Sequence, residues 1–249
     1  MKKIAYFIII IFLIAPVLLR AQEVLDSDND GLTDEEERNI YHTEVLNPDT
    51  DGDGYLDGEE IEHGYSPHFG NRTRLIDSDY DKDELNDALE IAFGSNLNNK
   101  DSDGDGYPDG HEVKYSYSPV NPKPEKLPKK IEIKISTQRL GYHLGGVKLD
   151  EFSVSTGLAS MPTPLGNFKI DGKHPRAWSG MANLWMPWWM SFYNGRFGIH
   201  ELPEWPGGYK EGENHLGQRA SHGCVRLGVG PAKFLYDWAP LGTPVIIIN

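Results

Sequence analysis

Cysteine is almost missing from this 249-residue chain, which contains only Cys224. A single cysteine cannot form a disulfide within the chain, so the fold must be held together without one. In an exported protein, a lone cysteine indicates a free reactive thiol or a bond to another molecule. The alternative is a small, buried apolar residue, and the residues around Cys224 decide between these interpretations.

Basic side chains are scarce between residues 22 and 120, where 28 aspartates and glutamates stand against 6 lysines and arginines. Such an acidic segment excludes nucleic-acid binding, because it would repel phosphates, and it favours cations. From residue 121 to residue 249 the balance is reversed, with 15 basic and 10 acidic residues. Two segments of opposite charge predict two modules with different partners.

Charged side chains are also missing from residues 4–19, an almost unbroken apolar run that follows Lys2 and Lys3. With the small residue Ala21 behind it, this pattern predicts a signal peptide over residues 1–21. The run is also about long enough to span a bilayer, so the alternative is an uncleaved anchor that tethers the protein to a membrane. Both interpretations predict an exported protein, in the periplasm or cell envelope.

One pattern of acidic residues, D-x-D-x-D-G-x-x-D-x-x-E, occurs four times between Asp26 and Glu112. Its carboxylates fall at positions 1, 3, 5, 9 and 12, the oxygen-ligand positions of a calcium loop in which position 7 supplies a backbone carbonyl and position 6 is glycine. These positions account for 20 of the 28 acids in this half. Carboxylates so close together repel one another until a cation coordinates them. The pattern predicts structural Ca²⁺, with a disordered acidic stretch as the alternative.

The predicted calcium ligands form one set of six in each repeat. In chain order these residues are Asp26, Asp28, Asp30, Leu32, Asp34 and Glu37; Asp49, Asp51, Asp53, Tyr55, Asp57 and Glu60; Asp79, Asp81, Asp83, Leu85, Asp87 and Glu90; and Asp101, Asp103, Asp105, Tyr107, Asp109 and Glu112. The third repeat has Glu84 where the turn needs glycine, so we expect its site to be the weakest. Short helical segments between the loops, such as 34–41 and 86–93, predict an α-rich module over residues 22–116.

The repeats resemble the EF-hand-like calcium repeats of extracellular bacterial proteins, which are akin to thrombospondin type-three repeats. The resemblance covers Asp26 to about Glu112. No entering helix is visible and position 8 carries no steady apolar residue, so the usual strand pairing between loops is not expected. The resemblance implies a spacer or adhesion arm that calcium makes rigid.

Residues 117–129 are rich in proline and lysine, which predicts a semi-extended linker. Beyond it, Ile131, Ile133 and Ile135 alternate with polar residues, as in a β-strand. Short apolar runs separated by Gly, Pro and Asn then continue to the C-terminus, which is typical of an all-β domain. We therefore expect a multidomain chain in which residues 130–249 form an all-β, β-sandwich-like catalytic domain behind the α-rich repeats.

The single cysteine lies in the segment S-H-G-C-V-R at residues 221–226, and G-I-H lies upstream at residues 198–200. A thiol is a weak nucleophile until it is deprotonated, and a nearby imidazole lowers its pKa. His222 would share a strand face with Cys224, whereas His200 must be brought to it by the fold. The alternatives are that His222 is a core histidine, or that zinc binds a set consisting of His200, His215, His222 and Cys224.

The same segment resembles the L,D-transpeptidase (YkuD-type) catalytic domain over about residues 131–249. Three further segments support the resemblance: V-S-T-G at residues 154–157, T-P-L-G-N-F at 163–168 and G-T-P-V at 242–245. The resemblance implies a β-sandwich-like fold and no cofactor for catalysis. The separation of 24 residues between His200 and Cys224 is longer than we expect in the family, and the extra residues are predicted within 201–218.

The resemblance also implies roles for the site residues. Cys224 would attack the carbonyl of an L,D peptide bond in a peptidoglycan stem peptide, while His200, oriented by the Glu201 carbonyl, would accept the thiol proton. Backbone N–H groups near Gly223 and Cys224 would hold the oxyanion, with help from His222. The residues expected to contact the substrate are Arg226 and Ser221.

The predicted function is therefore that of a peptidoglycan L,D-transpeptidase, which forms cross-links in cell-wall biosynthesis and so affects cell shape. One alternative is an L,D-carboxypeptidase, in which water takes the acyl group at the same site. Another is a calcium-dependent surface adhesin with an inactive catalytic domain, although the complete set of His200, His222, Gly223 and Cys224 argues against that loss. An aromatic cluster at residues 185–193 is expected in the core, in a lid or in a groove wall.

Overall fold

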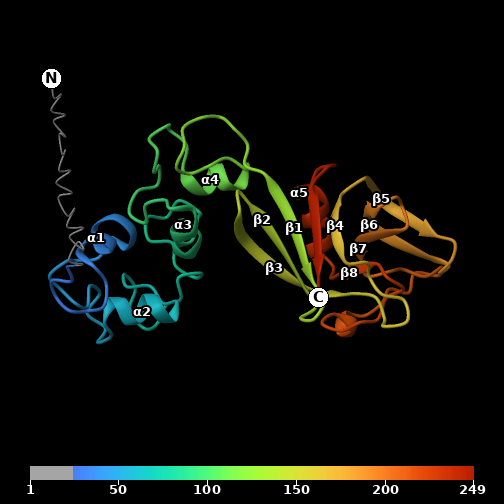
Figure 1. Cartoon of the computed structure of the whole chain (residues 1–249), viewed down its shortest axis with the longest axis horizontal. Coiled ribbons are helices and arrows are strands. Elements are labelled where there is room, and N and C mark those ends of the chain that lie inside the picture. Colours follow the sequence, from blue (N-terminus) through green and yellow to red (C-terminus); the bar gives the residue numbers. More distant parts are fainter. Residues whose placement is uncertain (1–24) are drawn as a thin grey trace, which may run out of the picture.

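The computed structural model describes residues 25–249 (Figure 1). The predicted signal peptide or anchor lies outside the described residues, so both interpretations of it stay predictions. Within residues 25–249, no helix is long and apolar enough to cross a membrane. The helical repeats lie at one end of the described chain and a strand-rich domain at the other (Figure 1).

Each acidic repeat is a loop followed by a short helical segment. The segments are α1 (Asp34–Glu36), which continues into the π-helix η1 (Glu37–Tyr41), then α2 (Asp57–His63), α3 (Asp87–Phe93) and α4 (Asp109–Lys114). Every α-helix begins at position 9 of its repeat, so the glutamate at position 12 lies one turn into the helical segment. The predicted α-rich character of this region is confirmed.

The four repeats pack as two pairs through glycines at position 10. A Cβ atom on Gly58 of the second repeat would overlap the backbone carbonyl of Asp30 in the first. Gly110 of the fourth repeat lies equally close to the Asp83 backbone of the third, and its N–H donates to the Asp83 carboxylate (2.8 Å). A close glycine contact thus joins the two loops of each pair.

Position 7 differs between the two members of each pair. Leu32 and Leu85, in the first and third repeats, are buried. Tyr55 and Tyr107, in the second and fourth, are exposed. The odd-numbered repeats therefore bury an apolar side chain at this position, while the even-numbered repeats present a tyrosine ring to solvent.

The C-terminal domain is built on one nine-stranded sheet. Its strands are β1 (Lys129–Lys134), β2 (Arg139–Leu144), β3 (Val147–Ser155), β4 (Gly166–Lys169), β5 (Gly172–Ser179), β6 (Leu184–Tyr193), β7 (Phe197–Glu201), β8 (Val225–Leu227) and β9 (Pro244–Ile248). They lie in the order β4-β9-β1-β2-β3-β8-β7-β6-β5. Pairing is antiparallel except between β1 and β9 and between β7 and β8. The alternating isoleucines fall in and just after β1, as predicted.

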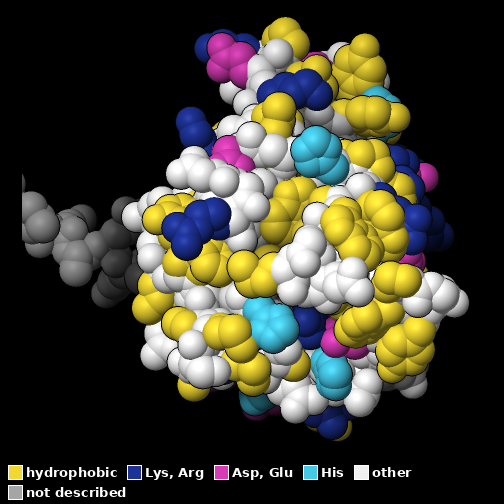
Figure 2. Space-filling model, turned by 90° about the vertical axis from the view of Figure 1, so that its right-hand side faces the viewer, with side chains coloured by type: hydrophobic (Ala, Val, Ile, Leu, Met, Phe, Trp, Pro, Cys, Tyr) yellow, Lys and Arg dark blue, Asp and Glu magenta, His cyan; other side chains and the backbone are white. Residues whose placement is uncertain are grey.

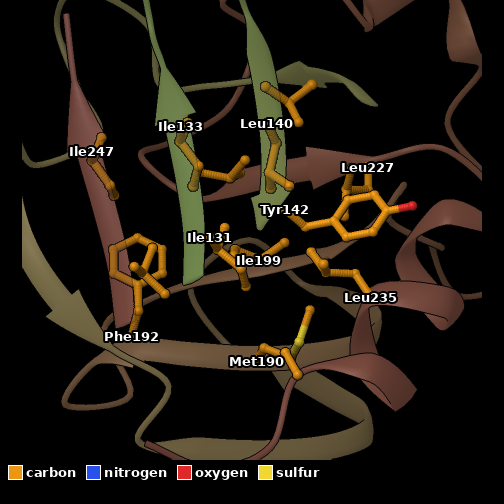
Figure 3. Close-up of a cluster of buried hydrophobic side chains, with 14 of the residues drawn as sticks. Ile131, Ile133, Leu140, Tyr142, Met190, Phe192, Ile199, Leu227, Leu235 and Ile247 are labelled. Carbon is orange, nitrogen blue, oxygen red and sulfur yellow. The ribbon is translucent and has the colours of Figure 1, made fainter. Parts of the chain in front are cut away.

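The two ends of this sheet share one hydrophobic core, which agrees with the predicted sandwich-like fold. Ile131 and Ile133 from β1 meet Met190 from β6 and Ile199 from β7 in this cluster (Figure 3). The core also receives Leu235 from α5 (Pro231–Trp238), a helix that was not predicted. Pro231 occupies the first turn of α5, where its missing N–H costs nothing.

A small second cluster joins the repeats to the sheet. Leu85 and Val113 from the third and fourth repeats pack with Leu144 at the end of β2, and Leu127 lies against them. The predicted linker has no helix or strand before β1 begins at Lys129. Its last residues are nevertheless packed between the two modules, so the fourth repeat lies close to the β2–β3 hairpin.

Candidate functional site

Parallel pairing of β7 with β8 brings the two distant motifs together. In this pair His200 lies opposite Arg226, and Cys224 precedes Arg226 by two residues. Residues two apart on an extended chain point to the same face. His200, Cys224 and Arg226 all line one cavity of about 610 Å³.

His200 is buried, with 2% of its surface exposed. Its Nδ1 lies 2.6 Å from the backbone carbonyl oxygen of Glu201, so Nδ1–H donates to that carbonyl and Nε2 is left as the acceptor. Burial, helped by the charge of Arg226, lowers the pKa of His200 to about 4. The ring is therefore neutral at pH 7 and able to take a proton.

The thiol of Cys224 is also mostly neutral in this structure. Burial raises its pKa above the ordinary value for a thiol, and a backbone hydrogen bond from Gly198 and the charge of Arg226 oppose this only in part. The expectation of a thiol pKa already lowered by the imidazole is therefore wrong for this resting site. Burial penalises the charged forms of both groups, so both are neutral in this structure.

The turn before Cys224 is held by its own hydrogen bonds. Ser221 Oγ donates to the Cys224 carbonyl (2.5 Å) and accepts the Gly223 N–H (3.1 Å). Gly223 has a φ of +108°, and a Cβ there would overlap the Phe197 ring, so only glycine fits. The exposed side chain of His222 borders the cavity.

This geometry changes two of the expected roles. Ser221 lines the cavity, but its hydroxyl is used within the turn, so we assign it to holding the nucleophile rather than to contacting substrate. The Gly223 N–H is directed to Ser221. The backbone N–H of Cys224 is then the candidate donor to an oxyanion from this segment.

Thr163 connects three motif segments and was not predicted as a site residue. Its Oγ1 donates to the Gly223 carbonyl (2.9 Å) and accepts the Gly157 N–H (2.9 Å). A Cβ on Gly157 would overlap the Met161 carbonyl. The order of the V-S-T-G and T-P-L-G-N-F segments was the available signal, but sequence alone did not reveal that they hold the cysteine turn.

Arg226 was expected to meet a substrate carboxylate, but the structure gives it a partner within the chain. Its Nη1 lies 2.9 and 3.0 Å from the two carboxylate oxygens of Glu211, and both side chains are buried. Glu211 also lies 3.0 Å from His215 Nδ1. The positive charge of Arg226 therefore lowers the pKa of both His200 and Cys224. The Glu211 carboxylate, paired with Arg226, partly offsets this charge.

Glu211 belongs to the longer-than-expected segment, of which Pro203 lines the cavity. Glu201 forms an ion pair with Lys210 (2.5 Å), and Lys210 also reaches Glu204 (3.3 Å). The backbone of Glu204 forms an antiparallel β-bridge with that of Trp185 in β6. The Glu204 carboxylate forms an ion pair with Arg176 of β5 (2.9 Å). The extra residues are thus fixed to the sheet at several points.

The opposite wall of the cavity is apolar. Trp178, Met181, Met186 and Trp189 from the β5–β6 hairpin line it, and the Trp189 ring lies 5.8 Å from the His200 ring. Hydrophobic side chains with histidines among them spread over this end of the molecule (Figure 2). The predicted aromatic cluster is therefore divided, since Trp189 borders the cavity while Phe192 lies in the core (Figure 3).

A zinc site at the cysteine does not form. Among residues 25–249, the groups of three or more His, Cys, Asp or Glu whose ligand atoms converge are four aspartate triplets, all in the repeats. They are positions 1, 3 and 5 of each loop, with ligand atoms within 4.8 Å of one another: Asp26, Asp28, Asp30; Asp49, Asp51, Asp53; Asp79, Asp81, Asp83; Asp101, Asp103, Asp105.

Each loop is folded around the aspartate at position 1. The Asp49 carboxylate, for example, accepts the N–H groups of Gly52 and Gly54 (both 2.9 Å). Glycines at position 6 have φ between +97° and +102°, whereas Glu84 of the third repeat is at +78°. The third loop adopts the common shape with Glu84 strained in the left-handed region, and its being the weakest site stays a prediction.

Carboxylate oxygens at positions 3 and 12 are buried without a hydrogen-bond partner. Among the described residues, both oxygens of Asp28, Glu60, Asp81 and Glu90 are in this state, as is one oxygen of Glu112. Burying a charged oxygen without a partner is costly. A hard cation bound by these oxygens would remove that cost, so the residues present fit Ca²⁺.

The aspartates at position 9 have other partners. The Asp109 carboxylate accepts the N–H (2.8 Å) and the hydroxyl (2.5 Å) of Ser102 at position 2. Asp34 and Asp57 accept the same two groups from position 2 of their loops, and Asp87 accepts the Tyr80 N–H and the Ser78 hydroxyl. We infer that this position closes the loop. At position 7, the N–H groups of Leu32, Tyr55, Leu85 and Tyr107 donate to the position-5 carboxylate.

Repulsion within the loops appears in the pKa values of their glutamates. Burial, with the neighbouring aspartates, raises the pKa of Glu60 to about 8, that of Glu90 to about 9 and that of Glu112 to about 8. Without a cation, these side chains hold protons that an unfolded chain would lose.

Comparisons with known families agree with this division of the chain. Residues 128–247 match the L,D-transpeptidase catalytic domain of the YkuD type. Residues 26–43, 49–64 and 101–115 match the bacterial TSP3 repeat, a match that leaves out the third repeat with its Glu84. The C-terminal part of this chain is therefore a YkuD-type L,D-transpeptidase catalytic domain, and TSP3 repeats precede it.

Individual relatives cover only this domain. A Bacillus subtilis (strain 168) protein, YciB, whose name assigns it provisionally to the L,D-transpeptidases, is 27% identical over an alignment of 127 residues, and the match covers 47% of this chain and 64% of YciB. A solved L,D-transpeptidase from Mycobacterium smegmatis is 20% identical, with a TM-score of 0.45, and 50% of this chain covers 60% of it. For one from Stackebrandtia nassauensis the identity is 28%, the TM-score 0.42 and the coverage 51% and 58%. The chain spans less than two thirds of each relative's length.

Without calcium, the stability of the repeats should fall as pH rises from about 5 to 8. The folded state keeps protons on Glu60 and Glu112 up to about pH 8, whereas an unfolded glutamate loses its proton near 4.5. The folded state thus binds more protons in this window, and the free energy of unfolding decreases with pH. Thermal unfolding in EDTA across this range measures the slope.

The variant Glu60→Gln should flatten this slope, since it removes one of the raised pKa values. The exposed Glu62, in the same helix, provides the matched control Glu62→Gln. A stability in EDTA that increases with pH, or an equal slope in wild type and Glu60→Gln, would contradict the predicted strain.

Proposed function

We propose that residues 128–247 catalyse cysteine-dependent acyl transfer at an L,D peptide bond of a peptidoglycan stem peptide. The observation that carries this proposal is the pairing of β7 with β8, which puts Cys224 and a neutral His200 on one cavity. The Glu201 carbonyl holds His200 Nδ1–H, so Nε2 is the nitrogen that can accept a proton. The match to the L,D-transpeptidase family supplies the substrate class.

In the proposed first step, Cys224 Sγ attacks the carbonyl carbon while its proton passes to His200 Nε2. The negative oxygen of the tetrahedral intermediate is held by the backbone N–H of Cys224, with His222 beside it. His200 then gives its proton to the leaving amine of the D-amino acid. A thioester between the stem peptide and Cys224 results.

In the second step, an acceptor attacks the thioester carbonyl while its proton passes to His200 Nε2, and His200 then returns this proton to the departing Cys224 sulfur. An amine from another stem peptide gives a cross-link, whereas water gives a shortened stem, which is carboxypeptidase activity. Both reactions use the same residues. Product masses from a purified tetrapeptide stem distinguish a dimer from a shortened peptide.

The repeats are proposed to bind structural Ca²⁺. Support comes from the buried, unpartnered oxygens at positions 3 and 12 and from the TSP3 match. A cation at each loop would remove the repulsion that raises the glutamate pKa values. Because the fourth repeat packs near the β2–β3 hairpin, calcium there would also stiffen the connection to the catalytic domain.

We also propose that the protein acts outside the cytoplasm, in the periplasm or cell envelope. The apolar run after Lys2 and Lys3 supports export. The proposed substrate and the calcium loops both suit that location.

A carbapenem should form a stable adduct on Cys224, because its strained carbonyl acylates an activated thiol. Intact mass measurement and peptide mapping locate the adduct. Cys224→Ala should form none, and His200→Gln should slow adduct formation by about 100-fold or more, the usual contribution of a general base. His174→Gln, a change at an exposed histidine away from the cavity, is the matched control. The absence of an adduct on wild-type Cys224 would refute the proposed chemistry.

Asp103→Asn should weaken calcium binding to the fourth loop, because one oxygen of this position-3 carboxylate is buried without a partner. Isothermal titration calorimetry of calcium binding should show one site fewer, or one site weakened by about tenfold or more. Asp77→Asn, at an exposed aspartate outside the loops, should leave all sites intact. Equal binding by Asp103→Asn and wild type would count against calcium at this loop.

A further inference from the structure

The second and fourth repeats carry the same aromatic arrangement beyond their calcium loops. Each has a tyrosine at position 7 (Tyr55 and Tyr107) and another at position 17 (Tyr65 and Tyr117). The backbone there is also the same, because Tyr65 N–H donates to the Glu60 carbonyl and Tyr117 N–H to the Glu112 carbonyl, both at 2.8 Å. The two repeats can therefore be compared residue by residue.

In the second repeat, the chain itself fills the space between the two tyrosines. The Arg72 guanidinium lies over both rings, 5.4 Å from the Tyr55 centroid and 4.9 Å from that of Tyr65. The cavity left there is only about 130 Å³. This copy of the arrangement is closed by a cation–π contact.

In the fourth repeat, the corresponding space is open. Lys126 lies over Tyr117 alone (4.5 Å), and its Nζ donates to the Tyr115 carbonyl (2.8 Å). The rings of Tyr107, His111 and Tyr115 follow one another, with centroids 5.9 and 4.6 Å apart. They line a cavity of about 330 Å³, and Tyr107 and Tyr115 are 57% and 51% exposed.

The residues of this cavity, which we name the tyrosine pocket, select the kind of ligand. Its volume is at the lower end of the range for small-ligand sites. Lys123 and Lys126 also line it, together with Asp105 and Glu112, two of the predicted calcium ligands. Ring faces can pack against the C–H face of a sugar, while lysine ammonium groups and tyrosine hydroxyls can bind oxygen acceptors.

We propose that the tyrosine pocket of the fourth repeat binds a glycan of N-acetylated amino sugars. The sugar faces stack on Tyr107 and Tyr115, and Lys123 and Lys126 donate to hydroxyl and acetamido oxygens. The Tyr117 ring, under Lys126, holds that ammonium group in the pocket. This inference rests on the proposed function for the choice of glycan, because stem peptides are carried on such strands. Val113 of the same helix packs in the cluster at the β2–β3 hairpin, so a bound strand would lie beside the catalytic domain.

The test uses the full chain with Cys224→Ala, in calcium, titrated with a soluble N-acetylglucosamine tetramer in a calorimeter. The changed cysteine prevents turnover, so binding is measured independently of acyl transfer. Saturable binding is expected, and Tyr115→Ala and Tyr117→Ala should each weaken it by about tenfold. A glucose tetramer, which lacks the acetamido groups, should bind more weakly.

Tyr65→Ala, the matched change in the closed second repeat, should leave binding unchanged, and Tyr115→Phe should retain it. Circular dichroism during calcium addition checks that every variant folds. The proposal is overturned if no saturable binding occurs, or if Tyr65→Ala weakens binding as much as Tyr117→Ala does. It is also overturned if arginine ethyl ester, which imitates the Arg72 side chain of the second repeat, occupies the pocket in preference to the sugar. A failure here together with a normal carbapenem adduct on Cys224 would leave the acyl-transfer chemistry standing.

Discussion

The active site depends on the parallel pairing of β7 with β8. This pairing places His200 opposite Arg226, and therefore puts it on the same face as Cys224 although 24 residues separate them along the chain. It also buries His200 and half-buries Cys224, and this loss of solvent keeps each of them neutral. While both groups are neutral, the thiol is a weak nucleophile. In the proposed reaction, charges form only when a substrate carbonyl takes up the electrons of the sulfur and backbone N–H groups stabilise the resulting oxyanion.

The repeats bring acidic groups close together, whereas the cavity of the C-terminal domain holds two neutral groups. Their carboxylates are held close together by Asx-type hydrogen bonds, by the position-9 aspartates and by the glycine contacts between loops. This framework leaves buried oxygens facing one another without partners. The proposed calcium would relieve this strain, so its binding would be coupled to the folding of the module. Leu85 and Val113 of this module pack against Leu144 at the end of β2, so the repeats and the C-terminal domain are in direct contact.

Local patterns in the sequence were sufficient to predict the two kinds of module, the short helices, the first strand and the motif segments that the fold brings to one cavity. Fixed spacing of aspartates and alternation of isoleucines are local signals, and they need no tertiary information.

The sequence could not reveal which residues distant along the chain become partners in the fold. The ion pair of Arg226 with Glu211, the link from Thr163 to Gly223 and the use of Ser221 within its own turn all depend on the folded sheet. The raised thiol pKa was missed for the same reason, since burial is a property of the fold. Helix α5 was missed because its eight residues lie among the short apolar runs of a strand-rich domain.

The pH dependence of the rate at which a carbapenem acylates Cys224 tests the central claim most directly. If His200 is a buried, neutral acceptor, the rate should stay high down to an acid limb at about pH 4, where the ring becomes protonated. In His200→Gln this limb should disappear along with most of the rate. An acid limb near the ordinary histidine value of about 6.5, or an identical profile for wild type and His200→Gln, would contradict the account of a buried neutral pair built on β7 and β8.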